Sequence, residues 1–333
     1  LDHAIDLAPD VSTYYGDRAT VYWACRQNVQ GQQGSGLSDR ADDRIYELCQ
    51  PEKQHERNQQ WVDRRPFNFR SRLALADSAL DLGLLKKDAI LIDQSTRLYR
   101  EVADMIPSSW PLWNRLAEVY VQIGEPRSAL LPLERSLEIT GDIEPSFDAL
   151  LLQARAYQGL GEREMAIESA DQALRHHPQE AEPYYIRGTL RYELNQFMRA
   201  LDDLDQAILL DQQHGQAYNN RGLTHARMGR LDLAVEDFSQ TVRLNPEFAT
   251  AYNNRGFAYR DLGNLDRAIE DLDQAIELDP EFAMAYFNRA LAYVLLGEDS
   301  KAQRDASVAV ELGFDPGSLQ AAMAEVKNRK SRE

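Results

Sequence analysis

The chain has 333 residues, of which 43% are hydrophobic, enough to bury a core. Its 54 acidic residues outnumber its 37 basic residues, so the formal net charge is −17. That charge disfavours nucleic-acid backbones and anionic membrane surfaces as partners, because their phosphates would repel the protein. No stretch approaches the roughly 18 apolar residues that a membrane span requires, so direct membrane insertion by this chain is not expected.

Residues 1–65 give the least regular pattern. Residues 1–9 match the end of a helix that Pro9 terminates, and residues 15–22 carry large and small side chains at helical spacing. Residues 27–39, QNVQGQQGSGLSD, predict a flexible loop. A short helix around 42–50 follows, and the polar run 50–65 is compatible with a long helix or a loop.

Both cysteines, Cys25 and Cys49, lie in this region and form no C-x-x-C motif, so no zinc knuckle or redox pair is predicted. If Cys25 ends one helix and Cys49 lies well along the next, antiparallel packing holds them apart. We therefore expect two free thiols, and the redox compartment stays open.

Residues 66–148 predict two helix hairpins with insertions. In the first hairpin, residues 72–83 form one helix and residues 99–107 belong to its partner, with a linker over 84–90. In the second, Trp113, Ala117 and Tyr120 lie on one helical face. Pro132 falls inside the following helix and should bend it. About three residues are inserted between 140 and 146.

Residues 149–314 repeat with a period of 34 residues. Residues 217–250 read AYNNRGLTHARMGRLDLAVEDFSQTVRLNPEFAT, and residues 251–284 read AYNNRGFAYRDLGNLDRAIEDLDQAIELDPEFAM. Three series recur at this step: small residues at Ala154, Gly188, Gly222, Gly256 and Ala290, alanines at Ala166, Ala200, Ala234, Ala268 and Ala302, and tyrosines at Tyr184, Tyr218, Tyr252 and Tyr286.

The spacing within one unit predicts a helix hairpin. Tyr252, Gly256 and Tyr259 share one face of a first helix, and Gly263 permits the tight turn that ends it. The second helix carries Ala268 at the contact with the first and stops before Pro280. Asn195 takes the turn position of its unit, where asparagine tolerates the same left-handed conformation. One hairpin cannot bury this face alone, so neighbouring hairpins must stack.

This pattern resembles the tetratricopeptide repeat, in which a large residue is followed by a small one, an aromatic, a glycine and then two alanines and a proline on a second helix. The resemblance implies an all-α fold, a right-handed superhelical solenoid of antiparallel helix hairpins. Its expected parts are a divergent region over 1–65, two repeats with insertions over 66–148, five regular repeats over 149–314 and a C-terminal capping helix over 316–329. Gln212 departs from the pattern by replacing the terminal proline.

The sequence lacks the motifs of an enzyme, a cofactor site or a metal site. It contains no H-E-x-x-H, no phosphate-binding loop and no G-x-S-x-G. The pair His176–His177 is placed at a helix end, where positive charge suits the helix dipole. The acidic clusters recur at equivalent positions of successive repeats and are interpreted as solvated faces; they comprise Asp202, Asp203, Asp205, Glu236, Asp237, Glu270, Asp271 and Asp273.

The resemblance implies a concave groove lined by the first helices, where a protein or peptide segment would bind. Asparagines on this face carry donors and acceptors that suit a peptide backbone, and large apolar residues suggest a ligand surface; packing against neighbouring repeats is the alternative. No lysine completes a clamp for a C-terminal carboxylate. The candidate groove residues are Tyr185, Thr189, Tyr192, Glu193, Asn219, Leu223, Arg227, Asn253, Phe257, Arg260, Asp261, Phe287, Leu291 and Val294.

The leading interpretation is thus a non-enzymatic scaffold for protein–protein interaction. Self-assembly into a ring or filament is an alternative, because the chain begins inside a repeat and an uncapped end can stack on another copy. A second resemblance joins residues 1–161 to the soluble repeat tail of bacterial O-antigen ligase/polymerase-like membrane proteins. It implies that more protein precedes Leu1 and an extracytoplasmic or membrane-attached location in a bacterium.

Overall fold

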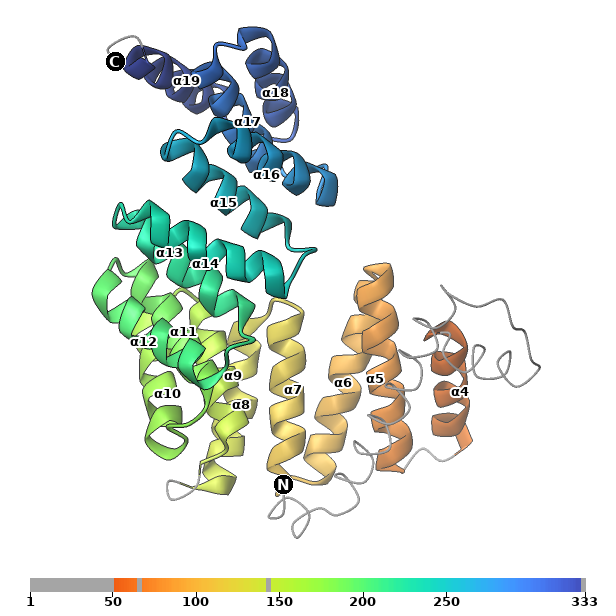
Figure 1. Ribbon diagram of the computed structural model, residues 1–333. Coiled ribbons are helices and arrows are strands. Elements are labelled where there is room, and N and C mark those ends of the chain that lie inside the picture. Colours follow the sequence, from red (N-terminus) through yellow and green to blue (C-terminus); the bar gives the residue numbers. More distant parts are fainter. Residues whose placement is uncertain (1–50, 65–67, 142–144, 331–333) are drawn as a thin grey trace, which may run out of the picture. The chain divides into compact units, whose positions relative to one another are not determined.

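The structure is a computed structural model that describes residues 51–64, 68–141 and 145–330 (Figure 1). The helices and loop predicted for the first 50 residues, with Cys25 and Cys49, lie outside these ranges. So do residues 142–144, within the predicted insertion.

Every regular element among the described residues is an α-helix, and successive helices pack as antiparallel pairs, so the predicted all-α solenoid of helix hairpins is confirmed. The chain divides into two compact units, residues 1–176 and 177–333. The described helices of the first unit are α4 Pro51–Arg64, α5 Phe69–Lys86, α6 Ala89–Met105, α7 Trp110–Gln122, α8 Pro126–Thr140, α9 Phe147–Gly159 and α10 Arg163–His176.

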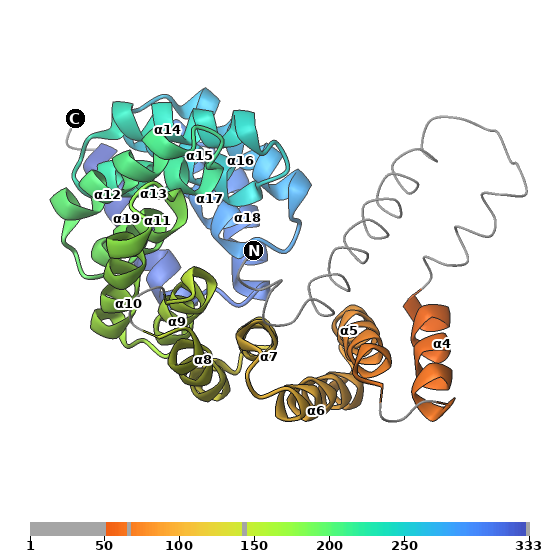
Figure 2. The ribbon, with the colours of Figure 1, turned by 90° about the horizontal axis from the view of Figure 1, so that it is seen from below.

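The second unit holds four hairpins and a final helix. Each first helix packs against its own partner and against the next first helix, and α13, α15 and α17 also pack against the second helix before them. In Figure 2, α12, α14 and α16 lie on the outer side of the curve that this unit follows. Its helices are α11 Ala181–Glu193, α12 Phe197–Leu210, α13 Gly215–Arg227, α14 Leu231–Leu244, α15 Ala249–Asp261, α16 Leu265–Leu278, α17 Ala283–Leu296, α18 Asp299–Glu311 and α19 Pro316–Lys330.

Glycines within the first helices permit the close approach of the two helices of a hairpin. A Cβ added to Gly222 would lie 2.8 Å from Cε1 of Phe238, and one added to Gly256 would lie 2.8 Å from Cγ of Leu272. Phe238 and Leu272 are fully buried. The small residues that recur in the sequence are therefore the points where the larger residue of the second helix packs.

The turn between the helices of a hairpin uses a left-handed residue, as the sequence predicts. Gly263 has φ 80°, and Asn195 takes the same role with φ 58°. Both residues follow the last turn of a first helix, where this conformation ends the helix.

Three details in the first unit differ from, or complete, the sequence interpretation. The linker predicted over 84–90 is wrong, because α5 continues to Lys86 and α6 begins at Ala89. Only Lys87, with φ 54°, and Asp88, whose carboxylate accepts from the backbone N–H groups of Ile90 and Leu91, form the turn. The polar run 50–65 is helical over α4, and α8 continues through the buried Pro132.

Candidate functional site

The first helices of the second unit, α11, α13, α15 and α17, pack side by side and present one continuous surface, which we call the first-helix face. A chain of side-chain hydrogen bonds, the amide ladder, runs along it. Its members are Thr189, Asn219, Asn220, Asn253, Asn254 and Asn288.

The amide ladder links each first helix to the next. Nδ2 of Asn220 donates to Oγ1 of Thr189 at 2.9 Å, joining α13 to α11. Nδ2 of Asn254 donates to Oδ1 of Asn219 at 3.0 Å, joining α15 to α13. Nδ2 of Asn288 donates to Oδ1 of Asn253 at 2.8 Å, joining α17 to α15. These amides therefore hold the repeats together, because buried polar groups need partners.

The ladder ends on a charged pair. Nη1 of Arg260 donates to Oδ1 of Asn288 at 2.9 Å, while Nη2 of the same guanidinium lies 2.7 Å from Oδ1 of Asp261. The guanidinium of Arg260 also lies 4.7 Å from the ring centroid of Phe257. Arg260 is thus only 8% exposed and orients two neighbouring side chains of the first-helix face.

Five of the predicted groove residues are therefore buried inside the array, which corrects the expectation of an open surface there. Asn219, Asn253 and Arg260 are buried within the amide ladder or at its end. Leu291 and Val294 are buried on α17, which packs against four other helices, including α19. The physical reason is that the following helix of the stack packs on each of these helices: α15 on α13, α17 on α15 and α19 on α17. The five are Asn219, Asn253, Arg260, Leu291 and Val294.

The remaining groove residues reach the surface. Arg227, Glu193 and Asp261 are exposed. The apolar candidates among them are half-buried, and two of them contact another aromatic ring. The ring centroid of Tyr185 lies 4.6 Å from that of His214, and the ring centroid of Phe287 lies 4.5 Å from that of Phe314. The half-buried set is Tyr185, Thr189, Tyr192, Leu223, Phe257 and Phe287.

A second repeated contact joins the two helices of each hairpin, and sequence reasoning missed it. Nη2 of Arg221 lies 2.6 Å from Oδ1 of Asp237, Nε of Arg221 donates to Oδ2 at 3.0 Å, and the guanidinium lies 5.4 Å from the ring centroid of Tyr218. Such two-bonded arginine–carboxylate pairs are strong and directional. The pairs are Arg187–Asp203, Arg221–Asp237, Arg255–Asp271 and Arg289–Asp305.

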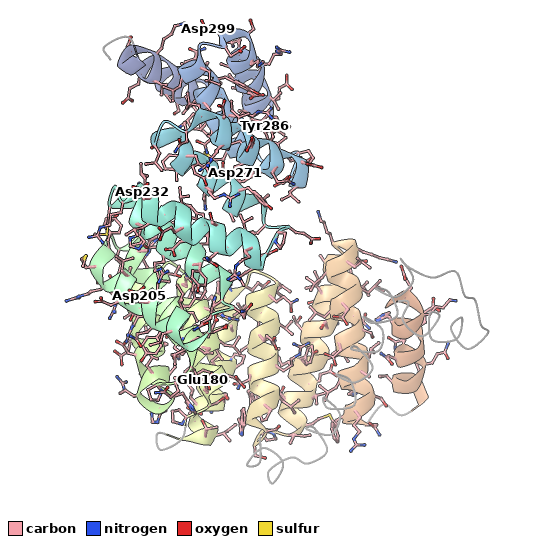
Figure 3. All side chains as sticks on the ribbon, in the orientation of Figure 1. Glu180, Asp205, Asp232, Asp271, Tyr286 and Asp299 are labelled. Carbon is pink, nitrogen blue, oxygen red and sulfur yellow. The ribbon has the colours of Figure 1, made fainter. Side chains whose placement is uncertain are left out.

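This contact corrects the interpretation of the acidic clusters as wholly solvated faces. Asp203, Asp237 and Asp271 are 2%, 4% and 7% exposed, whereas their cluster neighbours such as Asp205 are exposed. Asp205 on α12 and Asp271 on α16 are labelled in Figure 3. The sequence signal was available: an arginine followed 16 residues later by an aspartate recurs at the 34-residue period.

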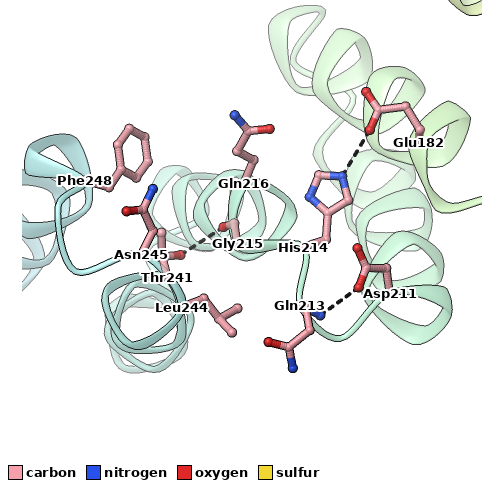
Figure 4. Close-up of a pocket in the computed structure, with 10 residues that line it drawn as sticks. All are labelled: Glu182, Asp211, Gln213, His214, Gly215, Gln216, Thr241, Leu244, Asn245 and Phe248. Carbon is pink, nitrogen blue, oxygen red and sulfur yellow. Dashed lines mark hydrogen bonds and ion pairs between the residues drawn. The ribbon is translucent and has the colours of Figure 1, made fainter. Parts of the chain in front are cut away.

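A depression of about 450 Å³ lies at the start of α13 (Figure 4). Nε2 of His214 lies 3.3 Å from Oε2 of Glu182, and its Nδ1 accepts from the backbone N–H of Ala217 at 3.2 Å. The imidazole therefore carries its hydrogen on Nε2 and points it at Glu182. The lining residues are Glu182, Asp211, Gln213, His214, Gly215, Gln216, Thr241, Leu244, Asn245 and Phe248.

Three segments match models of the tetratricopeptide repeat: residues 148–180, 215–248 and 258–297. Together with the stacked hairpins, these matches decide the family. The chain is a tetratricopeptide repeat protein. No curated protein matches it, so nothing in the comparisons bears on the resemblance of residues 1–161 to a membrane-protein tail.

Solved structures with the same helical fold include the Cut9–Hcn1 hetero-tetramer of the APC/C, at 18% identity and a TM-score of 0.61 over 90% of this chain and 58% of that chain. PilF of Pseudomonas aeruginosa matches at 21% identity and a TM-score of 0.58, over 65% and 97% of the two chains. MamA is 28% identical over 50% of this chain and 96% of its own, with a TM-score of 0.44.

Within the described ranges, no group of three or more histidine, cysteine, aspartate or glutamate side chains is arranged to hold a metal ion. Among the helices of those same ranges, none is long and apolar enough to cross a bilayer.

His225 is expected to make one repeat acid-sensitive. It stands where the next two tetratricopeptide repeats have Tyr259 and Tyr293. Its Nδ1 is buried without a hydrogen-bond partner, and its Nε2 lies 4.0 Å from Oδ2 of Asp237. Burial lowers the pKa of His225, although the Asp237 carboxylate opposes this effect.

Because folding lowers the pKa of His225, the unfolded chain binds a proton more readily than the folded chain does. The folded state therefore keeps its full stability above the unfolded pKa of about 6.5 and loses stability as the pH falls through the folded pKa. We expect His225→Tyr to lose less stability than the parent between pH 7 and pH 5. Thermal unfolding at both pH values measures this difference. His55, whose pKa burial also lowers, contributes equally to both proteins. An unchanged pH dependence in the variant would contradict the assignment.

Proposed function

We propose that this tetratricopeptide repeat protein is an interaction scaffold that binds an extended segment of another protein along the first-helix face. The observation that carries the proposal is the continuity of this face over α11, α13, α15 and α17. Repeat solenoids use such extended inner surfaces for binding. Half-buried aromatic side chains recur along it and Arg227 is exposed on it; aromatic residues and arginine are types that dominate binding energy at interfaces.

The amide ladder supports the proposal by holding the surface rigid. Side chains that are already ordered lose little conformational entropy when a ligand arrives. Asn220 and Asn254 are less buried than Asn219 and Asn253, and a primary amide has two donor hydrogens and two acceptor lone pairs. We therefore assign contact with a peptide backbone to Asn220 and Asn254 in place of the two buried asparagines.

The test is selection of peptides from a displayed random library on the full chain, followed by affinity measurement. Phe257→Ala and Leu223→Ala are expected to weaken a selected peptide at least tenfold, since each removes a half-buried anchor. The matched control is Leu233→Ala, which truncates a 43% exposed leucine on the second helix α14. The affinity of Phe287→Ala is interpreted only if this variant is folded, because Phe287 stacks on Phe314. Equal affinities for Phe257→Ala and the parent would refute the proposal.

Light scattering over a concentration series distinguishes the self-assembly alternative. If the particle mass stays equal to that of one chain at every concentration, the first-helix face is available for a different protein. Growth with concentration, abolished by Phe257→Ala, assigns the bound segment to another copy of the chain. The membrane-protein tail remains an expectation, which a multi-span region encoded upstream of Leu1 would support. No reaction is assigned to the repeat array.

A further inference from the structure

We propose that the depression at the start of α13 binds the side chain of an arginine or lysine carried by a partner protein. This inference rests on the proposed function only in that the partner is a protein. Its site lies at the inter-repeat loop 211–214, the start of α13 and the end of α14, apart from the anchors Leu223 and Phe257.

The depression lies where one repeat departs from the two repeats that follow it. Where the next two loops read Asn-Pro-Glu-Phe-Ala and Asp-Pro-Glu-Phe-Ala, residues 211–215 read Asp-Gln-Gln-His-Gly. A Cβ on Gly215 would contact Cβ of Leu244 at 3.6 Å, so glycine leaves this contact open. His214 replaces the phenylalanine and turns towards Glu182 and Tyr185. The sequence departure at Gln212 thus marks a local change of surface.

The charges lining the depression favour a cation. Its ten lining residues include the carboxylates of Glu182 and Asp211 and neither a lysine nor an arginine. His214 is held as a donor to Glu182 through Nε2, so in this geometry it adds no positive charge. Oδ1 of Asp211 accepts from the backbone N–H of Gln213, and a carboxylate has further acceptor sites. The last turn of α14 presents the negative end of a helix dipole to the depression and the first turn of α13 presents a positive end, so the two carboxylates decide the sign of the charge there.

The apolar part of the lining suits a long basic side chain rather than a metal ion. Leu244 and Phe248 supply an aliphatic and an aromatic surface, and the amides of Gln213, Gln216 and Asn245 surround it. Arginine and lysine bury their methylene stems against apolar surface and keep the charged head near acceptors. A guanidinium donates to carboxylate and amide oxygens in one plane, so arginine fits this lining best. Figure 4 shows Phe248 and Asn245 on one side of Gly215 and His214, Glu182 and Asp211 on the other.

The next repeat provides conservative test substitutions. Glu182 is equivalent to Gln216, and Asp211 is equivalent to Asn245, so Glu182→Gln and Asp211→Asn introduce residues that the same fold already holds. The Asn side chain retains the oxygen that accepts from Gln213. His214→Phe with Gly215→Ala gives two positions of the loop the residues of the next repeat and narrows the depression without removing a carboxylate.

The probe is Nα-acetyl-arginine methylamide, titrated into the 15N-labelled full chain, with the citrulline analogue as its neutral isostere. We expect the arginine probe to shift the amide signals of Gln213 and Gln216 and the citrulline probe to bind at least tenfold more weakly. Glu182→Gln/Asp211→Asn is expected to lose about tenfold in affinity, and added salt should weaken binding to the parent. The His214→Phe/Gly215→Ala variant should also bind the arginine probe more weakly.

Equal binding of citrulline, equal binding by the charge-removing variant, or signal shifts with inorganic phosphate in place of arginine would overturn the proposal. Phe257→Ala is expected to leave the arginine titration unchanged while it weakens a library-selected peptide. The two proposals therefore fail separately: loss of the arginine response alone removes this site, and loss of the Phe257 effect alone removes the binding role of the first-helix face.

Discussion

Replacing Asp237 with alanine is expected to lower the free energy of unfolding by about 3–5 kcal/mol, because it leaves the guanidinium of Arg221 without its buried partner. The Asp237 side chain is only 6% exposed, and it accepts two hydrogen bonds from Arg221. Burial raises the pKa of Asp237, and Arg221 opposes that rise. The cost of the alanine variant is thus mainly the cost of leaving Nε and Nη2 of Arg221, a side chain that is only 22% exposed, without their acceptors. Urea unfolding followed by circular dichroism measures it.

Asp205→Ala is the matched control, since Asp205 binds Nη1 of the same Arg221 at 2.7 Å but is 57% exposed. Exposed pairs contribute about 0.2–1 kcal/mol, so this variant should remain near the parent. The double variant Arg221→Met/Asp237→Leu removes both charges and should be more stable than Asp237→Ala. If Asp237→Ala and Asp205→Ala lost equal stability, burial would not be what makes this pair important.

Phe238→Ala is expected to destabilise the array by about 3–5 kcal/mol, through lost apolar burial and the cavity left behind. Phe238 is fully buried in a cluster with Ala234 and Ala258, and it packs against the helix backbone at Gly222. Since the cluster joins α14 to α15, the loss should disturb the next repeat as well. The unfolding free energy from urea denaturation is the measurement.

Phe238→Leu supplies a graded comparison, because Leu204 and Leu272 hold the equivalent position in neighbouring repeats. We expect it to cost clearly less than Phe238→Ala, since leucine fills most of the same space. Leu233→Ala, on the same helix but 43% exposed, should change stability by less than about 1 kcal/mol. A Phe238→Ala variant as stable as Leu233→Ala would show that the site collapses without a cavity.

The asparagines show most clearly which features the sequence predicted and which features only the structure revealed. Asn195 was predicted to be left-handed from its place after a first helix, and it is. Asn219 and Asn253 were predicted to face a ligand from their helical position, yet both are buried in the amide ladder. Turn conformation depends on a few neighbouring residues, whereas the burial of a helical side chain depends on a helix about 34 residues away.

The sequence by itself determined the repeating hairpin, because large, small and turn-forming residues at fixed spacing specify helix faces, helix ends and helix contacts locally. It also determined the family and the absence of recognisable catalytic motifs. Only the tertiary structure decided which acidic residue of each cluster is buried against an arginine and which side chains stay on the first-helix face. It also placed Glu182 and Asp211 at one depression. The physical reason is that burial, pairing and concavity are set by stacked neighbours, whose packing the spacing within one repeat does not describe.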